Sequence, residues 1–219
     1  MTLKNMKILA HRGYWKELSE RNTEEALKKA FAKGYGIESD IRDYDGKLVI
    51  SHDPANQNSM LAEELFKELA KYNNKLCFAI NIKADGLGEE LSKLLKENNI
   101  TNYFCFDMSV PQMIYYCENN FNVFARQSEY ETEPLSLYKE SQGVWIDAFC
   151  DDSWITEELI SKHIKNGKKI CLVSPELHSL PYLEFWKKLK SFNIDYSKVI
   201  LCTDVPDEAN EFFNKELTR

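Results

Sequence analysis

An excess of basic residues and a long apolar run are both missing from this sequence. The formal net charge of the 219 residues is −7, which argues against a nucleic-acid-binding protein, because such proteins usually carry a basic face. No apolar run is long enough to span a bilayer, and the opening run is too short for a secretory signal peptide. We therefore expect no stable membrane anchor and no nucleic-acid partner.

Closely spaced cysteine pairs are missing as well. The six cysteines are scattered and form no Cys-x-x-Cys motif, which argues against zinc or a disulfide framework. Cys77, Cys105, Cys171 and Cys202 fall in apolar, strand-like runs. This pattern predicts buried, reduced thiols in a cytoplasmic protein. Internal repeats, low-complexity tracts and obvious linkers are also lacking.

Apolar material is plentiful and regularly arranged. Hydrophobic residues make up 43% and aromatic residues 12% of the chain, enough for a sizeable core. Short apolar runs alternate with longer segments of helical period, which predicts a parallel sheet with crossover helices. The expected strands are residues 7–10, 36–41, 76–82, 103–106, 122–125, 143–146, 169–173 and 198–202. The expected helices are residues 23–33, 62–71, 88–98, 111–118, 135–140, 156–166, 181–192 and 207–216.

Eight strand–helix units in this length predict a closed (β/α)8 TIM barrel, formed as a single domain over residues 1–219. A count of seven or nine units would instead favour a doubly wound sheet. Asp45-Gly46 predicts a small hairpin that carries His52 back over the barrel mouth. Asn22 and Thr23 are expected to cap the first helix, and His163 is expected on the surface of the helix at 156–166.

Polar residues end nearly every expected strand. Active sites of barrel enzymes collect at the carboxyl ends of the strands, so these side chains are expected to meet there. A barrel with only a structural role would not need them. They are His11, Glu38, Asp40, Asn81, Lys83, Asp107, Arg126, Asp147, Ser174, Glu176, Thr203 and Asp204.

Glu38 and Asp40 are the strongest candidates for metal ligands. They lie two residues apart on one strand and so point to the same face. Two carboxylates facing one barrel mouth repel each other unless a cation lies between them, and oxygen ligands favour Mg²⁺ or Ca²⁺. The alternative is a solvated strand end with a salt bridge to Arg42.

His11 and His52 flank the two carboxylates in the sequence. Histidine is the usual general acid or base near neutral pH, so one ring is expected to take a proton and the other to give one. A structural role is the alternative for each. Arg12 and Lys83 are expected to neutralise a phosphate, the arginine through its planar fork and the lysine as a point charge. Surface salt bridges are the alternative for these two.

Further candidates carry a weaker signal. Asp107 and Glu176 end two expected strands and could each supply another metal ligand. Tyr14 and Trp15 directly follow His11-Arg12-Gly13 and could form a pocket wall, or could simply pack. His178 lies in a loop that could line the same pocket.

Several short motifs occur in order along the chain. They are His11-Arg12-Gly13, Asn22-Thr23, the segment 34–41 with its Glu-x-Asp, Asp45-Gly46 through His52-Asp53, and Thr203-Asp204-Val205-Pro206. In this combination the sequence resembles the glycerophosphodiester phosphodiesterase family, within the wider phospholipase C-like phosphodiesterase barrels. The match is dense over residues 8–54, thin in the middle, and clear again at 199–206.

The resemblance implies a TIM barrel that binds one divalent cation, Mg²⁺ or Ca²⁺, and hydrolyses a small phosphodiester. It implies that Glu38 and Asp40 bind the cation and that His11 and His52 form the acid/base pair. It also implies that Arg12 and Lys83 lie near the phosphate. In the family mechanism a substrate hydroxyl next to the ester attacks phosphorus, a cyclic phosphate forms, and water then opens it.

The chain also departs from the family pattern. The family strand that reads Glu-Ile-Lys is Asn81-Ile82-Lys83 here, so the expected third ligand is an amide that lacks one negative charge. Metal affinity should therefore fall, unless Asp107 or Glu176 compensates. Arg21 replaces the glutamate of Glu-Asn-Thr, and the insertion that covers the glycerol pocket in many members is short. These changes leave the substrate open.

Two other functions remain open at this stage. A non-catalytic barrel that binds a phosphorylated ligand would explain Asn81, although both histidines are retained. A barrel enzyme that abstracts a proton next to a carbonyl would need acidic ligands on three successive strands and a catalytic lysine, and Lys83 alone does not supply them. The sequence leaves the oligomeric state open.

Overall fold

The structure, a computed structural model, describes residues 6–215. The chain divides into two compact units. The N-terminal unit contains residues 9–123, and the C-terminal unit combines residues 6–8 with residues 124–215. In the C-terminal unit, Asn214 accepts a hydrogen bond from the Met6 backbone N–H at 3.1 Å and donates one to the Met6 carbonyl at 2.9 Å. These bonds attach the start of the described chain to its last helix.

The N-terminal unit is built on a mixed sheet. Strand β2 (Gly36–Tyr44) pairs in parallel with β1 (Lys7–His11) and with β5 (Phe78–Ile82), and β5 pairs in parallel with β6 (Tyr103–Phe106). Two short antiparallel strands, β3 (Lys47–Ile50) and β4 (Met60–Leu61), extend it. The first six residues of β2 are buried, as expected for a strand covered on both faces.

The predicted hairpin joins β2 to β3. Tyr44 pairs with Lys47 across a two-residue loop, in which Asp45 has φ 49° and Gly46 has φ 72°. Two successive residues with positive φ are typical of the tight turn that Asp-Gly favours. The hairpin returns the chain to the middle of β2, where the Ser51 N–H donates to the Asp40 carbonyl at 3.1 Å.

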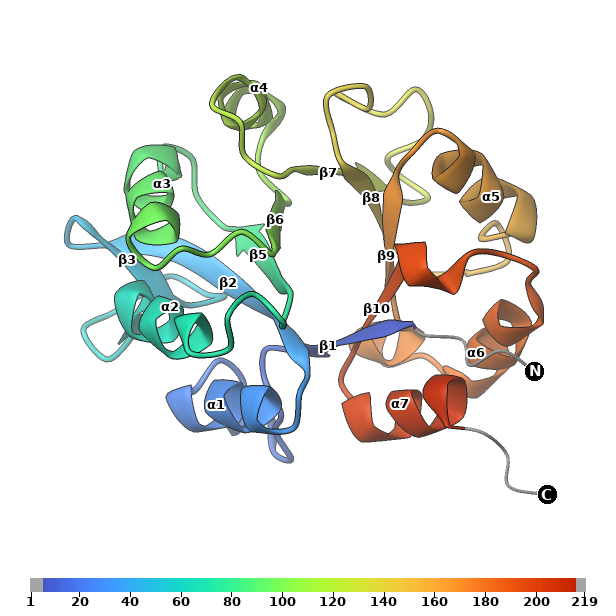
Figure 1. Cartoon of the computed structure of the whole chain (residues 1–219), viewed down its shortest axis with the longest axis horizontal. Coiled ribbons are helices and arrows are strands. Elements are labelled where there is room, and N and C mark those ends of the chain that lie inside the picture. Colours follow the sequence, from blue (N-terminus) through green and yellow to red (C-terminus); the bar gives the residue numbers. More distant parts are fainter. Residues whose placement is uncertain (1–5, 216–219) are drawn as a thin grey trace. The chain divides into compact units, whose positions relative to one another are not determined.

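Helices cover the N-terminal sheet on its outer side, with α1, α2 and α3 along β2 and β3 (Figure 1). The Thr23 hydroxyl caps α1 by accepting from the Ala26 N–H, as predicted, and two glutamates follow in its first turn. The apolar faces of α1 and α2 bury Phe31 and Phe66. The bounds are η1 (Leu18–Glu20), α1 (Glu24–Ala32), α2 (Ala62–Ala70), α3 (Gly88–Glu97) and α4 (Val110–Glu118).

The C-terminal unit contains a fully parallel sheet. Its strands pair in the order β10, β9, β8, β7, and Trp186 packs between helices of this unit, with its ring 5.6 Å from that of Phe213. The strands are β7 (Phe124–Gln127), β8 (Gly143–Ile146), β9 (Lys169–Val173) and β10 (Val199–Thr203). The helices are α5 (Glu157–Lys165), η2 (Pro175–His178), α6 (Leu183–Ser191), η3 (Tyr196–Lys198) and α7 (Pro206–Asn214).

The predicted alternation of parallel strands and crossover helices is confirmed, and each expected strand occurs with small shifts at its ends. The fold class is therefore α/β with a large parallel sheet. Closure into one barrel and a single domain stay predictions. Among the described residues, no helix has the length and apolar character needed to cross a lipid bilayer. The cysteines at 77, 105, 171 and 202 are buried, as expected.

Two local predictions are wrong. Residues 135–140 form turns instead of a helix, because Leu137 has φ 50°, a left-handed conformation that a helix does not accommodate. His163 does lie on α5, but it is only 1% exposed. The predicted helix at 207–216 is α7, and its residue 216 lies outside the described residues.

Buried His163 links α5 to β7 and to the turns that follow β7. Its Nε2 lies 2.8 Å from Gln127 Oε1, and its Nδ1 lies 2.8 Å from the Tyr138 hydroxyl. A neutral imidazole fits both partners, because Nε2–H donates to the amide oxygen while Nδ1 accepts from the hydroxyl. Burial lowers the pKa of His163 below its ordinary value. The two hydrogen bonds explain how a polar imidazole can be buried at this position.

Acidification is expected to destabilise the protein through His163. Its imidazole gains a proton near pH 6.5 when unfolded but resists protonation when folded, so its stabilisation is complete above pH 6.5 and is lost as the pH falls. The loss amounts to about 1.4 kcal/mol per unit of pKa difference. The free energy of unfolding, measured by chemical denaturation between pH 5 and 8, should fall less steeply with decreasing pH for His163→Gln than for wild type.

His178 provides the matched control for this experiment. The hydrogen bond that His178 donates to Asp147 raises the pKa of His178, so its stabilisation is present below pH 6.5 and is lost as the pH rises through its folded pKa. His178→Gln should therefore change the slope in the opposite direction. Equal slopes for wild type and His163→Gln would contradict the neutral, buried state of His163.

Candidate functional site

Three candidate metal ligands meet on two neighbouring strands of the N-terminal unit. Glu38 and Asp40 lie on β2, two residues apart, and therefore share a face. Asn81 lies on β5 opposite Asp40 in the parallel register. Their exposed fractions are 1%, 0% and 7%, respectively. The register of β2 and β5 thus brings together the three residues that the sequence suggested as ligands.

Each of these three residues has one buried oxygen without a hydrogen-bond partner: Glu38 Oε2, Asp40 Oδ1 and Asn81 Oδ1. Their other polar atoms are used, because Asn81 Nδ2 donates to Glu38 Oε1 at 3.2 Å and Asn22 Nδ2 donates to Asp40 Oδ2 at 2.9 Å. Buried acceptors without donors cost free energy, and a hard divalent cation would satisfy them. The donor set therefore fits Mg²⁺ or Ca²⁺.

The amide of Asn81 is essential to this argument. Within residues 6–215, no group of three or more His, Cys, Asp and Glu side chains is suited to hold a metal ion. A cation bound by Glu38 and Asp40 would therefore rely on the Asn81 carbonyl oxygen as its third protein ligand. The site would then hold the cation with two negative charges.

Electrostatics make the cation-free site unfavourable. Burial, and then the charge of Asp40, raise the pKa of Glu38 to about 8, while Arg12, the Asn81 hydrogen bond and Lys83 act in the opposite direction. Without a cation, burial and the neighbouring carboxylate therefore favour the protonated form of Glu38. Binding of a divalent cation would release that proton, because carboxylate ligands bind metals in their ionised form.

Two cationic side chains lie beside the buried carboxylates. Arg12 Nε is 3.1 Å from Asp40 Oδ2, and the Arg12 N–H donates to the Glu38 carbonyl at 2.9 Å. Lys83 Nζ lies 3.5 Å from Asp40 Oδ1 and 3.2 Å from Asp107 Oδ2. Both side chains are 18% exposed, so they border the place where an anionic group could approach the carboxylates.

The two candidate acid/base residues occupy different environments. His11 ends β1 opposite Glu38 in the register, and its Nε2 is 3.7 Å from Glu38 Oε2. His52 follows the hairpin two residues after Ile50, and its side chain is 43% exposed. Its Nδ1 lies 3.0 Å from Asp53 Oδ1. The structure thus places His11 against a candidate ligand and His52 on the exposed side of the same strand end.

Tyr14 and Trp15, the two aromatic residues in the loop after β1, make different contacts. Trp15 Nε1 donates to the His11 carbonyl at 2.9 Å, and the Arg21 guanidinium stacks 4.3 Å above the Trp15 ring. Trp15 therefore supports the backbone of the candidate catalytic histidine. Tyr14 instead packs against α1, where Lys29 and Lys33 lie 4.9 and 4.5 Å from its ring. A pocket role stays a prediction for both aromatic residues.

Asn22 has a role in the site that its sequence position did not reveal. The sequence suggested only a helix cap, but Asn22 Nδ2 donates to Asp40 and its Oδ1 accepts from the Ser39 hydroxyl at 2.7 Å. It has φ 60°, and its N–H donates to the Arg12 carbonyl at 2.9 Å. In the sequence, only its place in the Asn22-Thr23 motif could have indicated this contact with Asp40.

The weaker candidates are divided between the two units. Asp107 contacts Lys83 within the N-terminal unit. Glu176 belongs to the C-terminal unit, where it accepts from Ser174, from Thr203 and from the Asp204 N–H at 3.1 Å. Burial raises the pKa of Glu176, although these donors oppose the shift. Its role as a metal ligand stays a prediction, and its carboxylate already has donors.

His178 also belongs to the C-terminal unit. Its Nε2 lies 2.6 Å from Asp147 Oδ1, and the Phe149 ring packs 4.8 Å from the imidazole. The contact with Asp147 raises the pKa of His178. The structure therefore shows an imidazole anchored by Asp147, and the predicted pocket role of His178 stays a prediction.

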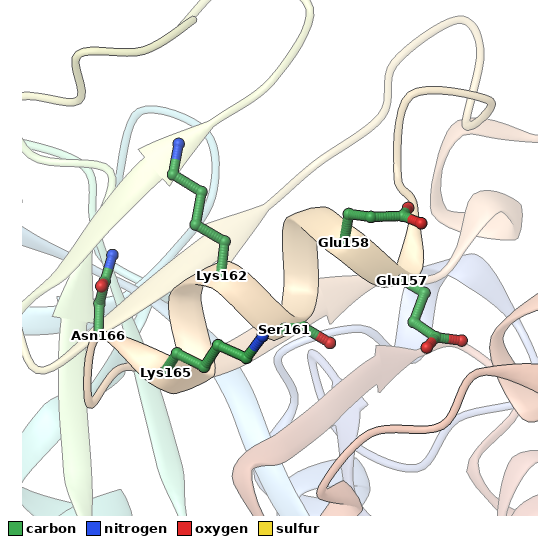
Figure 2. Close-up of a pocket in the computed structure, with 6 residues that line it drawn as sticks. All are labelled: Glu157, Glu158, Ser161, Lys162, Lys165 and Asn166. Atoms are coloured by element: carbon green, nitrogen blue, oxygen red, sulfur yellow. The ribbon is translucent and has the colours of Figure 1, made fainter.

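Two surface hollows occur in the C-terminal unit. One of about 460 Å³ is lined by charged and polar side chains that all project from α5 and the residue after it (Figure 2). The other, of about 440 Å³, is lined by residues 133–135 and 137–140 together with Lys162. Neither hollow is lined by a residue that the sequence predicted for catalysis, cation binding or phosphate binding.

Known structures share the fold of this chain. A glycerophosphodiester phosphodiesterase from Agrobacterium tumefaciens is 17% identical, with a TM-score of 0.66 over 92% of this chain and 97% of that chain. A phosphodiesterase from Oleispira antarctica, solved in complex with the product sn-glycerol-3-phosphate, is 14% identical, with a TM-score of 0.69 over 95% and 97%. No family model matches the chain, and no curated protein matches it by sequence.

A more distant similarity helps to place the fold. Phosphoribosyl anthranilate isomerase from Thermus thermophilus is 13% identical, with a TM-score of 0.51 over 95% of this chain and 96% of that chain. The TM-scores with the two phosphodiesterases are higher. The resemblance suggested by the sequence motifs is therefore confirmed for the fold: the chain has the α/β fold of glycerophosphodiester phosphodiesterases.

Asn81→Asp is expected to have opposite effects with and without a cation. A third carboxylate beside Glu38 and Asp40 should destabilise the cation-free protein by about 1–3 kcal/mol through like-charge repulsion. The same carboxylate should raise affinity for Ca²⁺ or Mn²⁺ about tenfold or more, because affinity follows the charge of the ligands. Thermal melts with and without each cation would measure both effects.

The exposed Asn58 offers a matched control. Asn58→Asp adds the same charge at an exposed position outside the three candidate ligands and should leave both the cation-free melting temperature and the cation-induced shift unchanged. If Asn81→Asp and Asn58→Asp gave the same cation-induced shift, the three oxygens would not form a cation site.

Proposed function

We propose that this protein is a metal-dependent phosphodiesterase that hydrolyses a glycerophosphodiester or a related small phosphodiester. The observation that carries the proposal is the set of three buried oxygens on Glu38, Asp40 and Asn81 that lack a hydrogen-bond partner, bordered by Arg12 and Lys83. A cation site beside two cationic side chains suits a phosphodiester. The likeness of the fold to two phosphodiesterases supports the proposal.

The proposed catalytic domain is a closed (β/α)8 barrel with Mg²⁺ or Ca²⁺ as its cofactor. When bound to Glu38, Asp40 and Asn81, the cation would act as a Lewis acid on a phosphoryl oxygen. Arg12 and Lys83 bind and orient the phosphate, the first through its planar fork and the second as a point charge. The protein is proposed to be cytoplasmic and to act on a small molecule.

His11 and His52 move the protons in this proposal. One imidazole takes the proton from the substrate hydroxyl next to the ester as that oxygen bonds to phosphorus. The other gives a proton to the alcohol oxygen as its bond to phosphorus breaks, which leaves a cyclic phosphate. In the second step the roles reverse: one imidazole takes a proton from water, and the ring oxygen leaves protonated. In this proposal the two histidines act from opposite sides of the phosphate.

The second candidate is a barrel that binds a phosphorylated ligand without turnover. Asn81 favours this alternative, because an amide in place of a carboxylate weakens cation binding. The retention of His11 beside Glu38 favours catalysis. The two functions differ in one measurable property, since only the enzyme converts a bound diester to a monoester.

Replacing His11 tests the catalytic proposal. His11→Gln removes the proton-transfer group while keeping similar volume, and should lower kcat about 10²–10⁴-fold for glycerophosphodiesters or a chromogenic diester. Affinity for sn-glycerol-3-phosphate should change little. Assays should be run with Mg²⁺, Ca²⁺ and Mn²⁺ in turn, and monoester release should be followed over time.

His163→Gln is the matched control, because His163 lies in the C-terminal unit and has a structural role. It should retain the wild-type kcat at a temperature where it remains folded. No diester turnover by wild-type protein with any of the three cations would contradict the enzyme. Binding of sn-glycerol-3-phosphate under those conditions would favour the binding barrel instead.

A further inference from the structure

Lys83 lies between two carboxylates that have different roles. Its Nζ is hydrogen-bonded to Asp107 Oδ2 at 3.2 Å and lies 3.5 Å from Asp40 Oδ1. Asp40 Oδ1 is also one of the three buried oxygens that lack a hydrogen-bond partner. The lysine ammonium and a divalent cation would therefore compete for the same oxygen atom.

The strand register accounts for this arrangement. Asn81 on β5 pairs with Phe106 on β6, so Lys83 and Asp107 follow closely after two paired residues. Asp107 has φ 72°, which turns the chain out of β6 immediately after the strand ends. Its side chain is 20% exposed, so the contact with Lys83 is partly shielded from water. Asp107 is thus fixed at a position from which it holds the lysine.

Competition for Asp40 has a larger effect in this chain because Asn81 is neutral. The cation is attracted by only two ligand charges, those of Glu38 and Asp40. Loss of one Asp40 oxygen to Lys83 would remove a protein ligand from a set that is already low in charge. The position of the lysine therefore controls how well the site binds a cation.

We propose that Asp107 is a positioning residue that holds Lys83 back from closer pairing with Asp40 Oδ1, so that this oxygen remains available to the divalent cation. The inference rests on the cation site of the proposed function. Asp107 touches neither cation nor substrate in this account and acts through the lysine. Groups that orient the immediate partners of a metal typically alter metal affinity 10- to 100-fold.

A double-mutant cycle tests this inference with Mn²⁺ as the probe. Calorimetric titration would compare wild type, Asp107→Asn, Lys83→Met and the double variant. Asp107→Asn should weaken Mn²⁺ binding about 10-fold or more, because the lysine then pairs with Asp40. With Met at position 83, the same change at 107 should alter affinity less than about twofold.

A simple long-range charge effect predicts a different result. Loss of the Asp107 carboxylate would then weaken Mn²⁺ binding by the same factor whether position 83 is lysine or methionine. Equal factors in the two backgrounds, or no loss in the single variant, would overturn the inference. Asp107→Glu, which restores a carboxylate partner for Lys83, should recover most of the wild-type affinity.

Asp85 is the matched control, since it is an exposed carboxylate in the chain segment that follows Lys83 and accepts from the Ser109 hydroxyl. Asp85→Asn should leave Mn²⁺ affinity unchanged. Because the titration measures binding, it is independent of turnover. Absence of Mn²⁺ binding by wild type would overturn both the inference and the proposed cation site. If Asp107→Asn weakened Mn²⁺ binding only in the presence of Lys83, and the protein hydrolysed no diester, the result would support the inference and contradict the proposed activity.

Discussion

Burial of two carboxylates on one strand is the constraint around which the N-terminal unit is organised. Glu38 and Asp40 are almost completely inaccessible to solvent, although ionised side chains are rarely buried unless they are paired. Contacts with other residues reduce this cost, because Arg12 pairs with Asp40 and Asn22 donates to it. Burial also raises the pKa of Glu38, which favours its neutral form. Even so, one oxygen of Glu38, one of Asp40 and the side-chain oxygen of Asn81 lack a hydrogen-bond partner. A protein that needed only stability would favour apolar residues at these positions, so the remaining cost indicates a functional site.

The pairing of the strands explains why the buried polar side chains lie close together. Parallel pairing of β2 with β1 and β5 aligns His11 with Glu38 and Asp40 with Asn81 across neighbouring strands. The loops that follow β1 and β6 contain residues with positive φ, Arg12 at 55° and Asp107 at 72°. Backbone strain of this kind persists where the surrounding structure fixes it, often near functional groups. The regular sheet thus supplies the positions, and the irregular loops supply the cationic side chains and their supports.

Much of this site could be predicted because strand residues alternate between faces. The Glu-x-Asp pattern alone placed Glu38 and Asp40 together, and the end of the next expected strand supplied Lys83. The motif resemblance added Asn81 as the third ligand. Other features depend on tertiary contacts that no local pattern encodes. Asn22 bonds to Asp40 across 18 positions, and His163 is buried because Gln127 lies 36 positions away in the chain. The helix expected at 135–140 does not form because Leu137 adopts a left-handed backbone conformation, which is unfavourable for leucine and which no local pattern predicts.

The central claim is that the oxygens of Glu38, Asp40 and Asn81 hold a divalent cation. Anomalous X-ray diffraction from crystals soaked in Mn²⁺ tests it most directly, because the signal locates the ion independently of any assay. The account predicts one strong anomalous peak within about 2–2.6 Å of an oxygen from each of the three side chains, the range of Mg²⁺ and Ca²⁺ bonds to oxygen. Saturated crystals with no peak at these residues, or with a peak only elsewhere in the protein, would contradict it.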